Sequence, residues 1–322
     1  MRSVLRQLAV ALALFWVVLT LTWMLIRVAP GDPVSFLAPP AASAADLARL
    51  RASLDLDAPL VVQYGRWARE IFKGDLGMSF VAHRPVTSVV AEAIPISVAL
   101  GGISLVLTFV LGVVVGGVQG AVRGSRLDSA LTLVTTTVYA APSFWLALSL
   151  IALFTYGAAR LGLPMWMRLP AFGVRDPAGS SGVVELVRHA VLPVLTLTLI
   201  GAAGIARYAR TSAVELLQLQ WVRTAIAKGV PARDVHARHV LANALPTLLI
   251  LFALALPGVL AGSVFVETVF GWPGVGRLMV SSIFARDYPV VVGATVVYAA
   301  TVILANLAAD LALPLVDPRR RT

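Results

Sequence analysis

The sequence predicts an all-α, polytopic membrane protein with six transmembrane helices and with both termini in the cytoplasm. Apolar residues make up 59% of the chain and the mean hydropathy is +0.87, whereas soluble proteins are roughly 45–50% apolar. Six charge-free runs each contain at least 18 residues, and a helix needs roughly 20 residues to cross the hydrocarbon core. The runs are Gln7–Ile26, Ala93–Val122, Ser129–Ala159, His189–Ala206, His239–Val266 and Tyr288–Ala309.

The placement of the basic residues predicts the orientation. With six spans, both termini share one face with the links at residues 123–128 and 207–240. Basic residues divide equally between the two faces, but this face carries them in much less chain, and the positive-inside rule then places it in the cytoplasm. The net charge of +10 therefore reflects the orientation of the chain in the membrane, and we expect no binding of nucleic acid.

The first element, residues 1–29, is a cytoplasmic tip followed by the first span. Arg2 and Arg6 before an apolar run also fit a cleaved signal peptide. However, the run is longer than the apolar core of about 7–15 residues in such peptides, and the following RVAPGDP offers no clean small-x-small cleavage site. We expect the run to remain as a membrane anchor.

Residues 30–92 are expected outside the membrane and carry helix signals. Ser43 and Asp46 have the spacing of a capping box. Pro59 suits a helix start and Gly74 a helix stop, with apolar residues at helical spacing between them. The second helix either lies on the membrane surface or against the spans of its own chain, or it forms a docking surface for an external partner.

Residues 93–313 are expected to form a core of five transmembrane helices that includes the cytoplasmic link at 207–240, followed by a basic cytoplasmic tail at 314–322. Pro142 should kink the third span, because proline removes a helical hydrogen bond. Pro193, Pro246 and Pro257 should interrupt later spans in the same way. Loops at Arg160–Arg188 and Glu267–Tyr288 are expected on the external face.

Several kinds of chemistry are missing from the sequence. There is no cysteine, and neither of the two lysines, Lys73 and Lys228, is followed by Ser or Thr as a P-loop requires. His236 and His239 share a helical face but have no third metal ligand nearby. Carboxylates occur only at the margins of the spans, which disfavours an ion-coupled carrier. We therefore expect no catalytic, cofactor or metal site, and the substrate-binding residues stay unidentified.

The basic insert WVRTAIAKGVPARDVHARH, Trp221–His239, stands out between apolar runs. A helix through 212–229 should stop at Gly229 in a left-handed turn, and Pro231 should open a second short helix. Two helices meeting at a glycine corner would form a compact cytoplasmic knob. The residues alone leave open whether this knob transmits force to another subunit or is only a solvated loop.

The insert resembles the cytoplasmic coupling loop of ABC-importer membrane subunits in the dipeptide/oligopeptide/nickel permease family. The core RTAIAKG, residues 223–229, and RHVLANAL, residues 238–245, are similar to that signature. Departures occur at Gln220-Trp221, where Asp-Tyr is usual, and at Ala242, where the broader importer signature has proline. Further similar motifs, in the family's order, are RVAPGDPV (27–34), GDLGMSF (74–80), APSFWLAL (141–148), VETVFGWPGVGRL (266–278), RDYPVV (286–291) and DPRRR (317–321).

The resemblance implies the B-type permease subunit of a peptide importer with the type I ABC importer fold, in the cytoplasmic membrane. Its implied partners are a homologous second permease, two ABC ATPase subunits, an extracytoplasmic solute-binding protein and membrane lipid. A stand-alone secondary carrier or channel is the alternative. A third class, an intramembrane hydrolase, would need a set of catalytic residues that this sequence does not provide. The implied ATPase-coupling residues are Arg223, Thr224, Ala225, Ala227, Lys228, Gly229, Pro231, Arg238 and His239.

Overall fold

The computed structural model describes residues 2–28, 34, 43–53, 57–176, 182–256, 258–261 and 264–316. Within these ranges the chain is helical, and its extended residues form only an isolated bridge between Met78 and Pro85. Six helices are long and apolar enough to cross a membrane, which confirms the predicted all-α, six-span class. These helices are Leu8–Val28, Val86–Ala121, Ser143–Arg160, Val183–Leu217, Ala232–Ala255 and Tyr288–Ala308.

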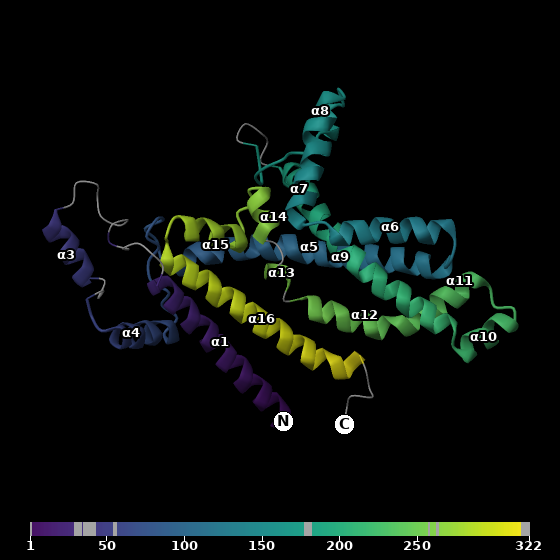
Figure 1. The fold of residues 1–322 in the computed structure, drawn as a ribbon, viewed down its shortest axis with the longest axis horizontal. Helices are drawn as coiled ribbons and strands as arrows, with labels where there is room; N and C mark the ends of the chain where they lie inside the picture. The colour runs from purple at the N-terminus through teal and green to yellow at the C-terminus, as the bar shows by residue number, and fades with distance from the viewer. Residues whose placement is uncertain are drawn as a thin grey trace. The chain divides into compact units, whose positions relative to one another are not determined.

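The chain divides into two compact units (Figure 1). The first contains Met1–Pro95 and Leu278–Ala300, and the second contains Ile96–Arg277 and Thr301–Thr322. Two long helices, α5 (Val86–Ala121) and α16 (Tyr288–Val316), therefore contribute to both.

The first unit begins with α1 (Arg2–Val28), α3 (Ala44–Ser53) and α4 (Leu60–Phe72). Helix α3 starts with the predicted capping box, since the Ser43 amide donates to Asp46 Oδ2 and the Asp46 amide donates to Ser43 Oγ, both at 3.2 Å. Helix α4 ends as predicted, because Gly74 has a φ of +82° and its amide donates to Ile71 O at 2.9 Å.

Helix α4 packs against α1 through aromatic side chains. Trp16 of α1 stacks on Phe72 with ring centroids 4.6 Å apart, and Trp23 meets Tyr64 edge-on at 5.3 Å. The Tyr64 hydroxyl also lies 2.7 Å from Thr20 Oγ1. Of the interpretations open for this helix, the structure supports packing against the chain's own first span.

The first unit contains a buried carboxylate, that of Asp287, directly before α16. Asp287 is 3% exposed and accepts hydrogen bonds from Ser79 Oγ at 2.5 Å and from the Phe80 amide at 3.0 Å. Beside it, Val86 and Val90 of α5 form a buried cluster with Val290 of α16.

The second unit starts with the rest of α5, α6 (Arg126–Ala140), α7 (Ser143–Ile151) and a π-helical stretch at Ala152–Gly157. Next come α8 (Ala158–Arg160), a 3₁₀ turn at Met165–Met167 and the long α9 (Val183–Leu217). Side chains of α7, α9 and α14 (Val264–Val269) form its main core, which includes Ala147, Leu192 and Val266.

The prolines act differently from the expectation. Pro142 has an extended backbone (φ −59°, ψ 138°) that separates α6 from α7 completely instead of kinking one helix. Pro193 lies inside a continuous α9 and Pro246 inside a continuous α12 (Ala242–Ala255), so neither interrupts its span. A proline costs a helix one amide, and neighbouring membrane helices can satisfy the carbonyl that this frees. Pro257 lies outside the described residues.

The last part of the chain contains more helix than expected. The stretch Glu267–Tyr288, expected as a loop, contains the end of α14 and the apolar helix α15 (Val275–Phe284).

The remaining elements are α10 (Gln220–Ala227), α11 (Ala232–Asp234), a π-helical stretch at Val235–Leu241, and α13 (Gly258–Ala261).

Candidate functional site

Between α9 and α12 the chain forms a bent helical segment, residues 218–241, which we name the elbow. The expected helix through 212–229 is broken, because α9 ends at Leu217 and α10 begins at Gln220. Leu219 has an extended backbone (φ −69°, ψ 143°) and its carbonyl accepts from the Val222 and Arg223 amides at 3.1 Å. The break turns Val222 inward, where its side chain is fully buried.

Gly229 forms the corner of the elbow. Its φ is +81°, its amide donates to Ile226 O at 2.9 Å, and the next amide, of Val230, donates to Ala225 O at 3.2 Å. This pair of bonds is the Schellman arrangement at a helix end. A Cβ at Gly229 would meet no atom within 4 Å, so the backbone conformation, rather than space, requires glycine here. The predicted left-handed turn is confirmed.

The second arm of the elbow is the start of a membrane span. Pro231 precedes the helix (φ −57°, ψ 142°), and the helix then runs without a break from Ala232 through the π-helical stretch to Ala255. The expected short second helix is therefore not a separate element. The second arm and the fifth span are therefore one continuous helix.

Each arm of the elbow buries apolar side chains. Val222 of the first arm and Val235 and Val240 of the second are 0%, 2% and 4% exposed. The ring of Trp221 lies 6.0 Å from that of His239, centroid to centroid, at 58°. The elbow is thus packed internally and does not have the character of a loose loop.

The nine sequence-predicted residues lie on this one segment, mostly on its surface. Ala225 and His239 are half-buried and the other seven are exposed: Arg223, Thr224, Ala227, Lys228, Gly229, Pro231 and Arg238. The Thr224 hydroxyl is occupied locally, donating to Gln220 O at 2.9 Å. The free face therefore offers cationic side chains and small residues, which suit close contact with another protein or with anionic headgroups.

Behind the elbow lies a mainly apolar cavity of about 350 Å³ between α5, α9 and the second arm. The elbow thus lies over a gap in the packing instead of a solid core. The cavity is lined by Val113, Val114, Gly117, Val118, Ala121, Ala209, Ala213, Arg233, His236, Ala237, Val240, Leu241, Ala244 and Leu248.

An ion pair that the sequence analysis missed fastens α9 to α6 before the elbow. Arg210 donates from Nε to Asp128 Oδ1 and from Nη2 to Oδ2, both at 2.8 Å, and the Gly124 amide donates to Oδ2 at 3.0 Å. The Arg210 guanidinium holds the pKa of the Asp128 carboxyl well below its usual range, aided by the Gly124 bond. The signal in the sequence was Asp128, the single carboxylate in the basic link at residues 123–128.

A second missed network surrounds Glu267, which the sequence placed at the margin of a span. Its side chain is fully buried and accepts from Ser97 Oγ at 2.6 Å and from the Arg277 amide at 3.0 Å. A Cβ on Gly276 would lie 2.9 Å from Glu267 Oε2, so the glycine-rich turn after α14 wraps this carboxylate closely. The glycines at 274 and 276 were the available signal.

Two protein-family models match this sequence. The family model described as binding-protein-dependent transport system inner membrane component matches residues 90–322. A second model, for the N-terminal part of such membrane components, matches residues 1–101. Between them the two models cover the chain.

Curated relatives align over nearly full length. The oligopeptide transport system permease protein AppB of Bacillus subtilis is 32% identical, over 98% of this chain and 98% of the relative. The probable D,D-dipeptide transport system permease protein DdpB of Escherichia coli is 35% identical, over 98% and 97%. A putative peptide permease protein of Brucella suis is also 35% identical, over 99% of this chain and 98% of the relative.

A solved structure shares the fold. The crystal structure of an amino acid ABC transporter with histidines matches with a TM-score of 0.52 at 12% identity, covering 71% of this chain and 94% of that chain. At this identity the match concerns architecture alone.

Proposed function

This chain belongs to the family of binding-protein-dependent transport system inner membrane components, and from that premise we propose that its cargo is a peptide. It is a multi-pass permease subunit of an ABC importer in the cytoplasmic membrane. The peptide proposal is supported by relatives named for oligopeptide and D,D-dipeptide transport.

The energy for transport would come from ATPase subunits on other chains. The sequence has no P-loop lysine of its own, and the family is a transport component. The partners would be a second, homologous permease, two ATPase subunits and an extracytoplasmic binding protein that delivers the peptide.

The elbow would be the contact through which the ATPase moves the spans, with the nine residues from Arg223 to His239 as its surface. ATP binding closes the ATPase pair, and the elbow follows because both of its arms are anchored by a buried side chain, Val222 in the first arm and Val235 in the second. The second arm is continuous with the fifth span, so the motion tilts that span and opens the pathway to the other side. This is alternating access driven by the different affinity of two states for ATP.

The orientation proposed from the sequence follows the same arrangement. Residues 1–29, the elbow within 207–240 and the tail 314–322 would face the cytoplasm, and residues 30–92 would face outward, with 93–313 as the permease core. The ATPase subunits could then reach the elbow, and the binding protein could reach the opposite face.

Reconstitution tests this function against the stand-alone carrier. The permease pair and its ATPase subunits would be placed in proteoliposomes with the binding protein outside, and uptake of a labelled peptide would be measured. We expect uptake against a gradient only with ATP on the ATPase side, and none from this chain alone under a proton or sodium gradient. Uphill uptake by the chain alone would disprove the proposal.

A further inference from the structure

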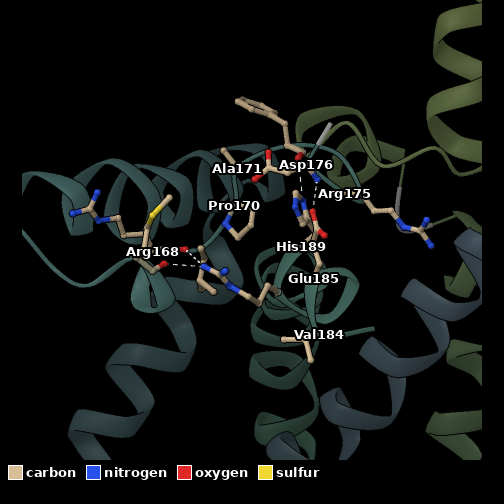
Figure 2. Close-up of a pocket in the computed structure, with 12 residues that line it drawn as sticks. Arg168, Pro170, Ala171, Arg175, Asp176, Val184, Glu185 and His189 are labelled. Atoms are coloured by element: carbon tan, nitrogen blue, oxygen red, sulfur yellow. Dashed lines mark hydrogen bonds between the residues drawn. The ribbon is translucent and has the colours of Figure 1, made fainter. Parts of the chain in front are cut away.

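At the opposite end of α9 from the elbow, side chains surround a pocket of about 680 Å³ (Figure 2). The pocket lies entirely in the second unit, between the first turns of α9 and the segment that precedes it. Helix α9 has 35 residues, so at about 1.5 Å per residue roughly 50 Å separate this pocket from the elbow.

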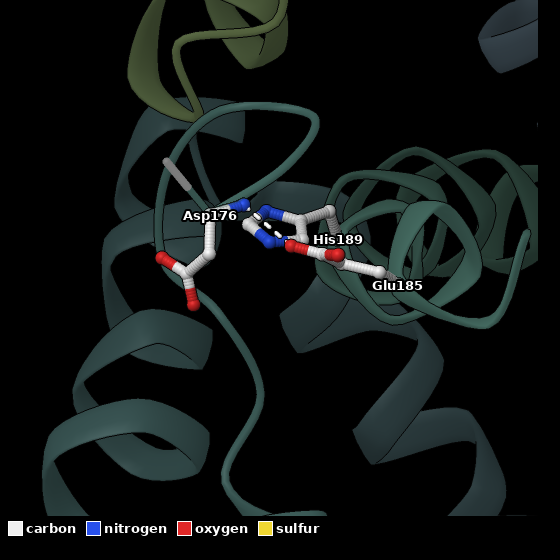
Figure 3. A group of neighbouring side chains, drawn as sticks. All are labelled: Asp176, Glu185 and His189. Carbon is white, nitrogen blue, oxygen red and sulfur yellow. Dashed lines mark hydrogen bonds between the residues drawn. The ribbon is translucent and has the colours of Figure 1, made fainter. Parts of the chain in front are cut away.

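Three potential metal ligands meet at the edge of this pocket (Figure 3). Glu185 and His189 are four residues apart on α9 and therefore share one face. Asp176, from the preceding segment, donates its backbone amide to Glu185 Oε1 at 2.6 Å. One ligand atom from each of the three residues lies within 4.8 Å of the other two.

The hydrogen bonds of His189 fix which ring nitrogen carries the proton. Nδ1 lies 3.1 Å from Phe172 O and 3.0 Å from Gly173 O. Carbonyl oxygens only accept, so Nδ1 is the N–H donor, and in the neutral ring Nε2 keeps a free lone pair. An imidazole that donates through one nitrogen to a carbonyl is oriented to bind a metal through the other.

The free lone pair is buried and has no partner within the described part of the chain. His189 is 4% exposed, and among the described residues neither its Nε2 nor Glu185 Oε2 has a hydrogen-bond partner. A buried acceptor without a donor is unfavourable in the folded chain, because it has lost its hydrogen bonds to water. A bound cation would satisfy both at once.

We propose that Asp176, Glu185 and His189 form a binding site for a divalent transition-metal ion of the zinc class. One imidazole with two carboxylates suits zinc, whereas a buried imidazole is not a preferred ligand of Mg²⁺ or Ca²⁺. Ligand atoms around tetrahedral zinc lie roughly 3.4 Å apart, given bonds of about 2.0–2.2 Å. Separations of up to 4.8 Å must therefore shrink by up to roughly 1.4 Å, and rotation of the exposed Asp176 side chain can contribute to this.

The neighbouring arginines leave room for a cation. Arg188 Nη2 is occupied by Met165 O and Arg168 O, both at 2.8 Å. Arg175 extends away from the three ligands (Figure 2). A metal here would fasten the segment ending at Asp176 to the first turns of α9. This site is independent of the transport function proposed above, so its test does not depend on a transport assay.

Zinc binding by the full chain in detergent micelles tests the site directly. After chelator treatment, Zn²⁺ would be titrated into wild type, His189→Gln and Asp176→Asn while bound metal is measured. We expect a single tight site in wild type and an affinity at least about 100-fold lower in His189→Gln, since loss of even an outer-sphere partner costs 10–100-fold. Zinc should also slow amide exchange of residues 172–176 in wild type only.

His83→Asn is the matched control, because it removes an exposed histidine elsewhere in the chain and should leave the affinity unchanged. Asp176→Asn keeps the test decisive if His189→Gln does not fold, since its side chain is exposed, and it should weaken zinc binding by at least about 10-fold. Absence of stoichiometric zinc in wild type, or equal binding by all variants, would overturn the proposal.

Discussion

At Gly229 a single backbone angle decides whether the elbow can form. A φ of +81° costs an L-residue roughly 1–2 kcal/mol, and a β-branched side chain suffers more. We expect Gly229→Val to leave the membrane-inserted subunit intact but to open the corner between the arms, so that ATP hydrolysis by the assembled complex continues while peptide uptake falls at least tenfold. Parallel assays of hydrolysis and uptake in proteoliposomes measure this uncoupling.

Gly162 offers a control of equal backbone strain. It also has a positive φ, of +68°, and a Cβ there would meet no atom within 4 Å, but it lies in the loop after α8. Gly162→Val should lower thermal stability to a similar extent and leave hydrolysis coupled to uptake. Equal uptake in wild type and Gly229→Val would remove the elbow from the mechanism.

The Asp128–Arg210 pair makes a prediction about geometry as well as charge. Arg210→Lys keeps the positive charge but loses the two parallel hydrogen bonds of the guanidinium, so its melting temperature should fall nearly as far as that of Asp128→Asn. A double-mutant cycle on the purified subunit, read by thermal unfolding, should show strong coupling. Additive effects of the two substitutions would contradict the pairing.

The pH dependence of this pair follows from the sign of its pKa shift. Folding lowers the pKa of Asp128, so its stabilising contribution is complete above the unfolded value of about 3.9 and is lost as pH falls toward the folded pKa. The difference in melting temperature between wild type and Asp128→Asn should therefore be constant from about pH 5 to 8 and shrink only below about pH 4. A difference that shrinks already near pH 6 would mean that another group is responsible.

At the scale of whole helices, α5 and α9 approach closely because small residues face each other. Gly112, Gly116 and Gly120 recur every four residues on one side of α5, and a Cβ on Gly120 would lie 2.6 Å from Ala213 Cβ of α9. In a membrane such close approach is a main source of helix association. The two helices that enclose the cavity behind the elbow are thus held together by close van der Waals contact, which the small residues permit.

Substitutions on the two sides of α5 should therefore differ sharply. A Cβ on Gly116 would clash with Ala206 O and lie 2.7 Å from Ala209 Cβ, whereas a Cβ on Gly117 would meet nothing within 4 Å. We expect Gly116→Leu to lower the melting temperature strongly. Gly117→Ala should be neutral or stabilising by up to about 1 kcal/mol, because alanine favours helix. Thermal unfolding in detergent decides, and equal effects would contradict the packing.

The sequence analysis succeeded where a helix is set by chemistry within a few residues. Ser43 with Asp46 and the stops at Gly74 and Gly229 are local hydrogen-bond patterns, and each is present in the structure. It failed where the outcome depends on distant partners. The break at Leu219 buries Val222, and the helix around Pro193 continues in spite of the missing amide.

Buried carboxylates show the same limit more clearly. Asp287 accepts from Ser79 and Phe80, which are more than 200 residues away in the sequence, and Glu267 accepts from Ser97, 170 residues away. A single sequence shows these acids as charges near the end of a span. Only the folded structure shows that their oxygens accept hydrogen bonds from distant segments, Asp287 from Ser79 and Phe80 and Glu267 from α5 and α15.

At the scale of the whole molecule, the absence of cysteine makes the proposed orientation directly measurable. The chain has no cysteine, so one introduced thiol reports on one position. Ala227 in the elbow and Leu161 after α8 are both exposed, and the predicted topology puts them on opposite faces of the membrane. Each can therefore carry a cysteine with little disturbance of the fold.

We expect a membrane-impermeant maleimide added to intact cells to label Leu161→Cys and to spare Ala227→Cys, and the reverse in inside-out vesicles. The reason is the positive-inside bias, which predicts that Arg223, Lys228 and Arg238 of the elbow lie on the cytoplasmic face. Association with the ATPase subunits should then slow labelling of Ala227→Cys in inside-out vesicles, because the elbow would be covered, while Leu161→Cys in intact cells should react at an unchanged rate. Labelling of Ala227→Cys from outside intact cells would invert the orientation and would leave the elbow out of reach of any cytoplasmic ATPase.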